Sequence, residues 1–338
     1  MAKYLDLSGL SRLWGKITSK AVMADRVMSL SASEQSQARA NIGAANTNPN
    51  LLRNWYWVGG GTAGKFPINQ RGQNYYEANG YTIDGWKSVN LYANGNTVKV
   101  ATQDGGLVLA GNTGSQDSYV QFQQIVENPP YGKEVTLSVF VDTIGADSEG
   151  NYPQIWCGAS AYKNVTNVGL TSLTFTYPTA SSENYIRIIL YDGTTAAASI
   201  RILAIKLELG PVSTLEQDAA PDYGVELAKC QRDLWVDTVE ANTVLADGIA
   251  FNTQGIFDYI TPVSMRKGTI TATFTTTPYV TYGTGNLAAL SAGAVSVTHN
   301  RDGNHLRFVA TLSADVGNLT EIHLLAGSAT TITISNEP

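Results

Sequence analysis

Three predicted strands carry aromatic, amide and basic side chains on one face and aliphatic side chains on the other. In residues 119–123 the polar side chains alternate with Val120 and Phe122, and in residues 185–190 they alternate with Ile186 and Ile188. Aromatic rings stack on the flat faces of sugars, and amide or guanidinium groups bond sugar hydroxyls. If the faces align, they form a surface suited to a glycan. The candidate residues are Tyr119, Gln121, Gln123, Trp156, Tyr185 and Arg187.

The same alternation also fits two plainer interpretations. These positions are equally typical of a solvated sheet face, or of a face that packs against another copy of the chain. Other large aromatic residues are expected in the core, because large aromatics mostly fill cores. These are Trp55, Tyr56, Trp57 and Trp86.

Oxygen-bearing side chains alternate in the segment Asp-Ser-Glu-Gly-Asn. Asp147, Glu149 and Asn151 could converge on a hard cation, so a structural Ca²⁺ is one hypothesis for this segment. The spacing only partly matches a helix-loop-helix calcium loop, and the predicted flanks are strands. An acidic turn with solvated side chains is the alternative.

Motifs for catalysis are not found in the sequence. It has no Gly-x-Ser-x-Gly elbow, phosphate-binding loop or His-Glu-x-x-His helix. A glycosidase needs two carboxylates a few ångströms apart, and the sequence cannot place such a pair. The available carboxylates are Glu127, Glu134, Asp142, Asp192 and Glu208. We therefore predict a protein that is not an enzyme.

Composition limits the class of protein. Of 338 residues, 43% are hydrophobic and only 15% are charged, which is enough apolar material for a sizeable core and too little charge for a disordered chain. The net charge of −6 argues against nucleic-acid binding, which needs a basic face. With 32 Gly, 17 Tyr and 6 Trp, the composition favours a mostly β protein.

The sequence also predicts where the chain is made. Cys157 and Cys230 show no disulfide or metal spacing, so both are expected as reduced thiols. The first residues lack the apolar region of a secretory signal, and no apolar run reaches the roughly 18 residues of a membrane span. We expect synthesis in a cytoplasm and no membrane insertion.

One helical stripe stands at the start of the chain. Its apolar residues recur at intervals of three and four, which is typical of an amphipathic helix: Leu7, Leu10, Leu13, Trp14 and Ile17. A lone helix of this size is marginal in water. The stripe therefore needs a partner, either copies of itself or a docking platform, and residues 1–48 are predicted to be a helical attachment or trimerisation segment.

From residue 49 onward, apolar residues recur at every second position. Short alternating runs are separated by glycine-rich turns, which predicts a β-sandwich or jelly roll over residues 49–210. One run is expected to place Ile200, Ile202, Ala204 and Lys206 on one face, opposite Arg201, Leu203, Ile205 and Leu207. Residues 211–248 are predicted as a linker and neck with a helix over 223–236. Residues 249–338 are predicted as an antiparallel β tip, with strands near 269–277, 295–298, 306–312 and 330–334.

Several phrases resemble bacteriophage or prophage tail-fibre proteins. At the amino end these are residues 4–17, YLDLSGLSRLWGKI, and residues 38–45, ARANIGAA. Residues 50–55, NLLRNW, followed by INQRG at 68–72 and YTIDGW at 81–86, resemble the opening of a carbohydrate-binding-module-like jelly roll.

Three later phrases resemble the segment that closes this jelly roll. They are KLELG at 206–210, APDY at 220–223 and ELAKCQR at 226–232, and PVSMR at 262–266 resembles the first strand of a fibre-tip domain. Apart from PVSMR, the phrases are spread over the first 235 residues in a consistent order.

This resemblance implies a receptor-binding fibre. Such chains are homotrimers in the virion that attach by the amino end to the phage tail or baseplate and bind a bacterial cell-surface glycan or other receptor. They assemble in the bacterial host cytoplasm. Two alternatives stay open: a structural baseplate or fibre spacer without its own receptor site, and a polysaccharide-degrading fibre enzyme.

Overall fold

The structure is a computed structural model that describes residues 48–77, 79–89, 97–114, 118–158, 161–266, 269–282, 286–289, 295–299, 305–312, 315 and 318–337. The chain divides into two units, residues 1–47 and 48–338. The predicted attachment residues Leu7, Leu10, Leu13, Trp14 and Ile17 lie outside the described residues.

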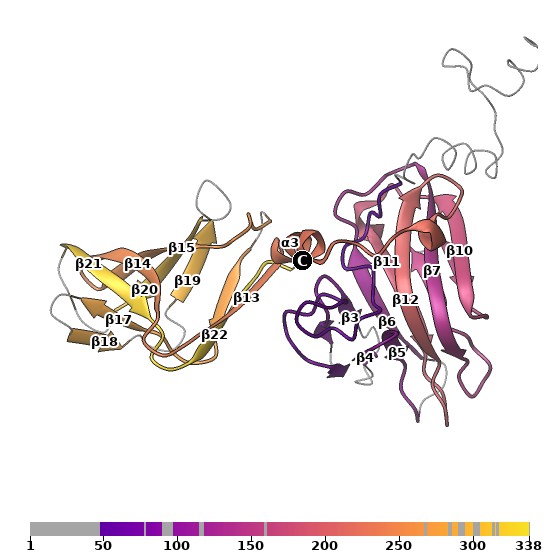
Figure 1. Cartoon of the computed structure of the whole chain (residues 1–338), viewed down its shortest axis with the longest axis horizontal. Helices are drawn as coiled ribbons and strands as arrows, with labels where there is room; N and C mark the ends of the chain where they lie inside the picture. Colours follow the sequence, from indigo (N-terminus) through magenta and orange to yellow (C-terminus); the bar gives the residue numbers. More distant parts are fainter. Residues whose placement is uncertain are drawn as a thin grey trace, which may run out of the picture. The chain divides into compact units, whose positions relative to one another are not determined.

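Two six-stranded antiparallel sheets build the first sandwich (Figure 1). In spatial order, the first sheet contains β1 (Tyr75–Glu77), β4 (Lys99–Gln103), β5 (Gly106–Ala110), β12 (Ser199–Leu209), β7 (Glu134–Gly145) and β10 (Gly169–Thr176). The second contains β2 (Gly80–Tyr81), β3 (Lys87–Val89), β6 (Tyr119–Ile125), β11 (Tyr185–Tyr191), β8 (Gln154–Cys157) and β9 (Ala161–Asn164).

Alternating aliphatic residues from both sheets form one core. Trp57 and Trp86 are fully buried in it, and Trp86 stacks on Phe122 with ring centroids 5.0 Å apart. Burying one such side chain stabilises the fold by about 1.5–3 kcal/mol. The core prediction is confirmed for Trp55, Trp57 and Trp86, whereas Tyr56 is half-buried.

The predicted alternation along β12 is wrong in its second half. The register against β7 shifts between Arg201 and Ala204, as a β-bulge does. Ile205 and Leu207 therefore join the core beside Ile202. Lys206 and Glu208 are buried as well, where they bond Thr214 in the segment that follows the strand.

A short helix, α3 (Tyr223–Gln231), follows the first sandwich. The Asp222 side chain caps its first turn by accepting a hydrogen bond from Val225 N at 2.9 Å. The helix ends earlier than predicted, because Leu234–Val239 forms strand β13 and pairs with β22. Two short 3₁₀ helices, η1 (Ser181–Glu183) and η2 (Leu215–Gln217), complete the helical content described.

The C-terminal part has its own core, centred on Phe257 and Phe308. A three-stranded sheet contains β13, β22 (Thr330–Ser335) and β16 (Thr271–Phe274). A seven-stranded sheet contains β18 (Asn286–Ala289), β17 (Tyr279–Tyr282), β21 (Asn318–Leu325), β14 (Val244–Phe251), β15 (Gln254–Ile260), β20 (His305–Thr311) and β19 (Val295–His299). The mostly β, antiparallel fold is confirmed. β13 and the start of β14 fall within the residues predicted as linker and neck.

Candidate functional site

A row of polar and aromatic residues crosses the second sheet of the first sandwich. Antiparallel pairing aligns one residue from each strand, and directly opposed side chains lie about 4.5–5.5 Å apart at Cβ. Their sequence neighbours, such as Phe122, Ile155 and Ile186, point into the core, so the row occupies the opposite face. We call it the cross-strand row: Tyr81, Lys87, Gln123, Arg187, Trp156 and Tyr162.

An aromatic platform forms one end of the cross-strand row. The rings of Trp156 and Tyr162 are stacked, with centroids 4.5 Å apart and 14° between the planes. Tyr162 is 53% exposed, whereas Trp156 is half-buried. A flat, partly exposed pair of rings is the kind of surface on which a sugar ring stacks.

Arg187 lies in the middle of the row between aromatic rings. Its guanidinium carbon is 4.7 Å from the ring centroid of Tyr185 and 5.3 Å from that of Trp156. Arg187 Nη1 donates a hydrogen bond to Gln121 Oε1 at 3.2 Å, and Nη2 donates to the Gly158 carbonyl. Arg187 is therefore fixed from several sides, and its position is set before any ligand arrives.

Two donors beside the platform lack protein partners. Among the described residues, neither Arg187 Nε nor Gln121 Nε2 has a hydrogen-bonding partner, although Arg187 is only 9% exposed and Gln121 only 2% exposed. An unsatisfied buried donor costs about 1–3 kcal/mol. A ligand with a hydrogen-bond acceptor that reaches these two N–H donors would therefore bind more favourably.

A chain of amides fixes the indole ring of the platform. Trp156 Nε1 donates to Gln154 Oε1 at 2.7 Å, and Gln154 Nε2 donates to Asn164 Oδ1 at 2.8 Å. Gln154 and Asn164 are opposed on neighbouring strands, so the sheet itself holds the chain of amides in place. The ring orientation is therefore set by protein contacts.

The structure brings together most of the predicted glycan-binding residues. Gln123, Trp156 and Arg187 lie in the cross-strand row, and Gln121 and Tyr185 contact Arg187. Tyr119 is at the other end of β6, where its ring meets Tyr191 edge-on at 6.2 Å.

Sequence reasoning missed three members of the row: Tyr81, Lys87 and Tyr162. They lie in strands of two to four residues, which are too short to show a clear alternation.

A small pocket adjoins the Tyr81 end of the row, and a larger pocket lies next to the small one. The smaller, of about 30 Å³, is lined by Arg53, Tyr81, Gly85, Lys87, Gln123 and Ile125. The larger, of about 230 Å³, shares Arg53 and Ile125 with it and extends towards Glu127, Lys229 and Arg232. The face therefore continues from an aromatic platform into a basic, partly enclosed end.

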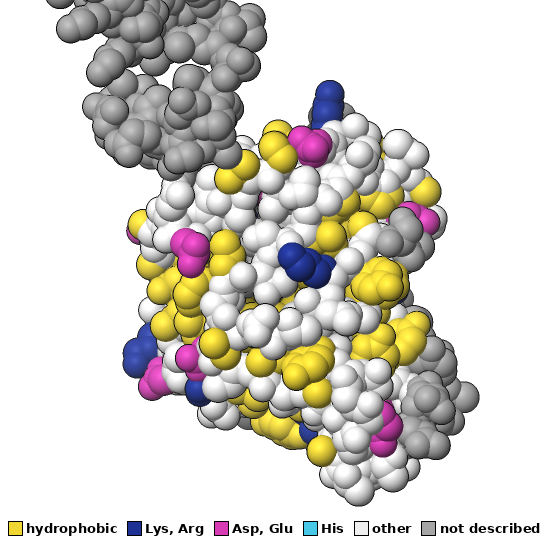
Figure 2. Space-filling model, turned by 90° about the vertical axis from the view of Figure 1, so that its right-hand side faces the viewer, with side chains coloured by type: hydrophobic (Ala, Val, Ile, Leu, Met, Phe, Trp, Pro, Cys, Tyr) yellow, Lys and Arg dark blue, Asp and Glu magenta, His cyan; other side chains and the backbone are white. Residues whose placement is uncertain are grey.

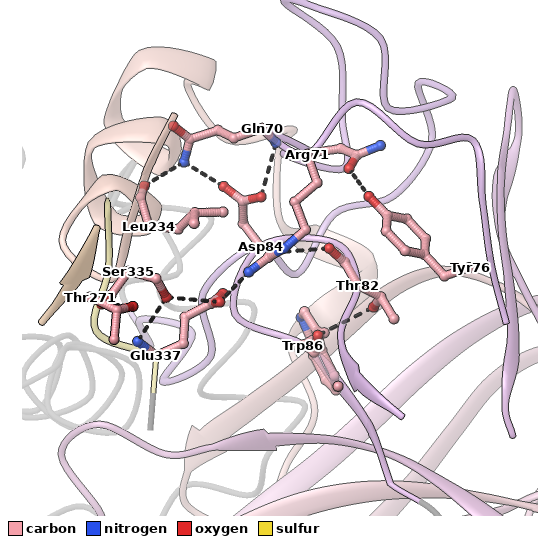
Figure 3. A network of polar contacts seen from close by, with 12 residues as sticks. Gln70, Arg71, Tyr76, Thr82, Asp84, Trp86, Leu234, Thr271, Ser335 and Glu337 are labelled. Carbon is pink, nitrogen blue, oxygen red and sulfur yellow. Dashed lines mark hydrogen bonds and ion pairs between the residues drawn. The ribbon is translucent and has the colours of Figure 1, made fainter. Parts of the chain in front are cut away.

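A network of polar contacts connects Gln70, Arg71 and Asp84 with Leu234 and Glu337 (Figure 3). Asp84 accepts two hydrogen bonds from Gln70, whose amide also donates to the Leu234 carbonyl at 2.7 Å. Arg71 pairs with Glu337. Burial raises the pKa of both Asp84 and Glu337, because the charged carboxylate is desolvated there.

The predicted calcium ligands are only partly brought together. Asp147 Oδ1 accepts hydrogen bonds from the backbone N–H groups of Glu149 and Asn151, and Oδ2 accepts from Asn151 Nδ2 at 2.8 Å. Glu149 turns away to accept a hydrogen bond from Thr194 Oγ1 at 2.6 Å. In the described part of the chain, no three His, Cys, Asp or Glu side chains converge as metal ligands.

Three of the carboxylates considered for catalysis are held in ion pairs. Glu127 pairs with Arg232 at 3.0 Å and with Arg266 at 3.1 Å. Asp142 pairs with Arg201, and Glu208 lies 3.5 Å from Lys206. These ion pairs indicate a structural role for the three carboxylates.

The surface seen in Figure 2 has few charges. Lys, Arg, Asp and Glu side chains are scattered there among uncharged polar and apolar ones, in keeping with the low charged fraction of 15%. None of the helices in the described part of the chain has the length and apolar character needed to cross a bilayer.

No family model matches the chain, and no curated protein matches it in sequence. Among solved structures, it is similar to the N-terminal CBM22-1–CBM22-2 tandem domain of Paenibacillus barcinonensis Xyn10C, with 13% identity, 87% of this chain and 91% of that chain covered, and a TM-score of 0.27. The N-terminal domain of the Streptococcus gordonii adhesin Sgo0707 matches at 11% identity, with 85% of this chain and 80% of that chain covered, and a TM-score of 0.15. Likenesses at this level carry no weight for function, which rests on the geometry of the site.

Proposed function

We propose that this chain is a glycan-binding protein that attaches a bacteriophage tail fibre to a bacterial surface polysaccharide without catalysis. The observation that carries the proposal is the cross-strand row, in which a stacked Trp156–Tyr162 pair lies beside Arg187 and Gln123. Rings for stacking and donors for hydroxyls are both needed for sugar recognition, and the row places them next to one another.

Binding at this face is shallow, because the row lies on a sheet surface. We therefore expect weak affinity at each site and strong attachment through several copies. Linked sites raise the overall affinity by about 10²–10⁴ without new contacts when they engage together. A homotrimeric fibre, present in several copies on a virion, supplies that multiplicity.

The place of the chain in a virion rests on its sequence. The phrase at residues 4–17 resembles the amino-terminal attachment segment of tail fibres, and the phrase at residues 38–45 resembles one common in tail-fibre chains. We therefore infer that the amino end joins the phage tail or baseplate and that assembly takes place in the host cytoplasm. The sandwich that follows is the part that carries the glycan site.

Labelling of host bacteria with the purified chain tests this function. We expect Tyr162→Ala and Trp156→Ala each to weaken labelling about tenfold, since aromatic anchors dominate binding surfaces. Tyr75→Ala is the matched control, because Tyr75 is similarly exposed, at 49%, on an edge strand of the other sheet. Equal labelling by all variants would contradict the site, and no labelling by the native chain would favour a fibre spacer.

A further inference from the structure

The small pocket at the end of the cross-strand row is lined by two cations and by no acidic residue. The cations are Arg53 and Lys87, and the other lining residues are Tyr81, Gly85, Gln123 and Ile125. The whole chain carries a net charge of −6, so a pocket lined by two positive charges and no negative one differs from the protein as a whole. It also shares Gln123 and Tyr81 with the proposed glycan face.

Arg53 is held in place while its Nε lacks a hydrogen-bonding partner among the described residues. Gln124 bonds both backbone groups of Arg53 at 2.9 Å, and Arg53 Nη1 pairs with Asp233 Oδ2 at 3.0 Å. The side chain is 6% exposed, and its Nε has no hydrogen-bonding partner among the described residues. The guanidinium is thus fixed in place beside the pocket with an unsatisfied N–H group.

Glycine makes room for this arrangement. Gly85 has φ +76°, and a Cβ added there would lie 2.5 Å from Arg53 Nε. Such a contact is far shorter than van der Waals distance, so only glycine allows the guanidinium to lie against this turn. The turn and the arginine therefore form one unit.

Lys87 supplies the second positive charge. In the described structure it forms no ion pair, and its ammonium lies 5.4 Å from the ring centroid of Tyr81. It is opposed to Gln123 in the sheet, so it belongs to the cross-strand row itself. An anion in the pocket would meet Lys87 on one side and Arg53 on the other.

We propose that this pocket takes the anionic group of an acidic sugar, and that the receptor is therefore an acidic polysaccharide. The pocket, at about 30 Å³, holds about two water molecules by the usual measure. It therefore suits a carboxylate, sulfate or phosphate group while the sugar rings lie on the row. Hydrogen bonds to an ionised group are roughly twice as strong as neutral ones. This inference rests on the proposed function of the same face.

Matched pairs of oligosaccharides test the inference by direct titration of the full chain. The probes are oligogalacturonate and its methyl ester, and a sulfated and an unsulfated galactan. We expect the charged member of at least one pair to bind about tenfold more tightly than its neutral counterpart. The probe that shows the preference identifies the anionic group.

Lys87→Gln is the informative variant, because it removes the charge from a partly exposed position and leaves the buried Arg53–Asp233 pair intact. Because Lys87 also belongs to the cross-strand row, the readout is the ratio of the affinities for the charged and the neutral probe. We expect Lys87→Gln to abolish the preference for the charged probe, and Lys87→Arg to restore it. Lys133→Gln removes an exposed lysine from the loop before β7 and serves as the control.

Equal affinity for charged and neutral probes would overturn the inference while leaving the glycan site in place. A preference that survives in Lys87→Gln would overturn it as well, because the anion would then bind elsewhere. If the native chain binds no glycan of either kind, the proposed function itself fails, and this inference fails with it.

Discussion

Arg187 illustrates how side chains of the site hold one another in position. It stacks between two rings and donates to Gln121 and to the Gly158 carbonyl. An arginine fixed in this way loses little conformational freedom when a ligand binds, so more of the contact energy remains as affinity. Lysine could not replace it, because an ammonium lacks the planar fork that meets both partners.

Gly85→Ala should destabilise the protein more than substitution at a matched glycine. Gly85 and Gly72 both have positive φ, +76° and +68°, but only at Gly85 would a Cβ meet Arg53. We expect Gly72→Ala to cost about 1–2 kcal/mol from backbone strain. Gly85→Ala should cost about 3 kcal/mol or more, because it also displaces a buried ion pair.

Urea denaturation of the two variants checks this prediction. Equal losses of unfolding free energy would mean that backbone strain alone matters and that Arg53 is free to move aside. A larger loss at Gly85, together with weaker binding of charged glycans, would tie the turn to the pocket.

Acidification should increase the contribution of the buried carboxylates to the stability of the folded protein. Burial raises the pKa of Asp84, Asp233 and Glu337. Between the unfolded-state pKa of about 4 and these raised values, the folded chain binds more protons than the unfolded chain. The contribution of these groups to the unfolding free energy therefore falls as pH rises through this window and grows as pH falls.

Comparison with Asp233→Asn isolates this effect from other titrating groups. We expect the gain in unfolding free energy from pH 7 down to pH 4 to be larger in the native chain than in Asp233→Asn. Denaturation curves at pH 4, 5, 6 and 7 measure the gain in both proteins. Identical pH dependence in the two proteins would show that Asp233 does not contribute.

At the scale of single elements, β12 joins the core to the segment that follows it. Its bulge directs Lys206 and Glu208 away from the core residues Ile205 and Leu207, and both charged side chains are fully buried. Lys206 Nζ reaches Thr214 Oγ1 at 2.7 Å and Asp218 Oδ2 at 2.6 Å, and Glu208 accepts from Thr214 N at 2.7 Å. These bonds hold the segment around η2 near the strand.

Lys206→Met should therefore be strongly destabilising. It leaves Glu208 buried without its cation, and breaking a buried ion pair by removing one partner costs about 3–5 kcal/mol. The double variant Lys206→Met/Glu208→Gln should recover part of that loss, because it removes the uncompensated charge. Urea denaturation measures both, with Lys133→Met as the exposed control; no recovery in the double variant would contradict this account.

The strands were more predictable than their alignment. Val135, Leu137, Val139 and Val141 stand at every second position of the sequence, and all four are buried in the core, because one residue in two of a strand faces the core. The bulge in β12 was not predictable, since one extra residue leaves no mark in an aliphatic run. Nor was the cross-strand row, which runs perpendicular to the chain and depends on the register of several strand pairs.

The candidate site was predictable to the extent that its residues lie in long strands. Arg187 and Gln123 lie on seven-residue strands and were identified from alternation. Tyr162 is in a four-residue strand that is exposed along most of its length, so no buried face marks its orientation. Arg53 lies outside the named strands, and long-range contacts with Gln124 and Asp233 give it a place near the site.

At the scale of the whole molecule, the fibre proposal makes a claim about mass. One chain has a mass of 36.1 kDa, and a homotrimer should show three times that value by light scattering behind a sizing column. Removing residues 1–47 should lower the assembly state if the predicted helical stripe provides the seam. A monomeric full-length chain would contradict the trimer and would leave a single-site glycan-binding protein.

The central claim is that the cross-strand row binds sugar. Titration calorimetry with a bacterial oligosaccharide, selected on a glycan array by the native chain, tests it most directly. We predict that the double variant Trp156→Ala/Tyr162→Ala loses measurable binding while its unfolding transition stays cooperative and Tyr75→Ala binds normally. Unchanged affinity in the folded double variant would contradict the account, because the sugar would then bind away from the row.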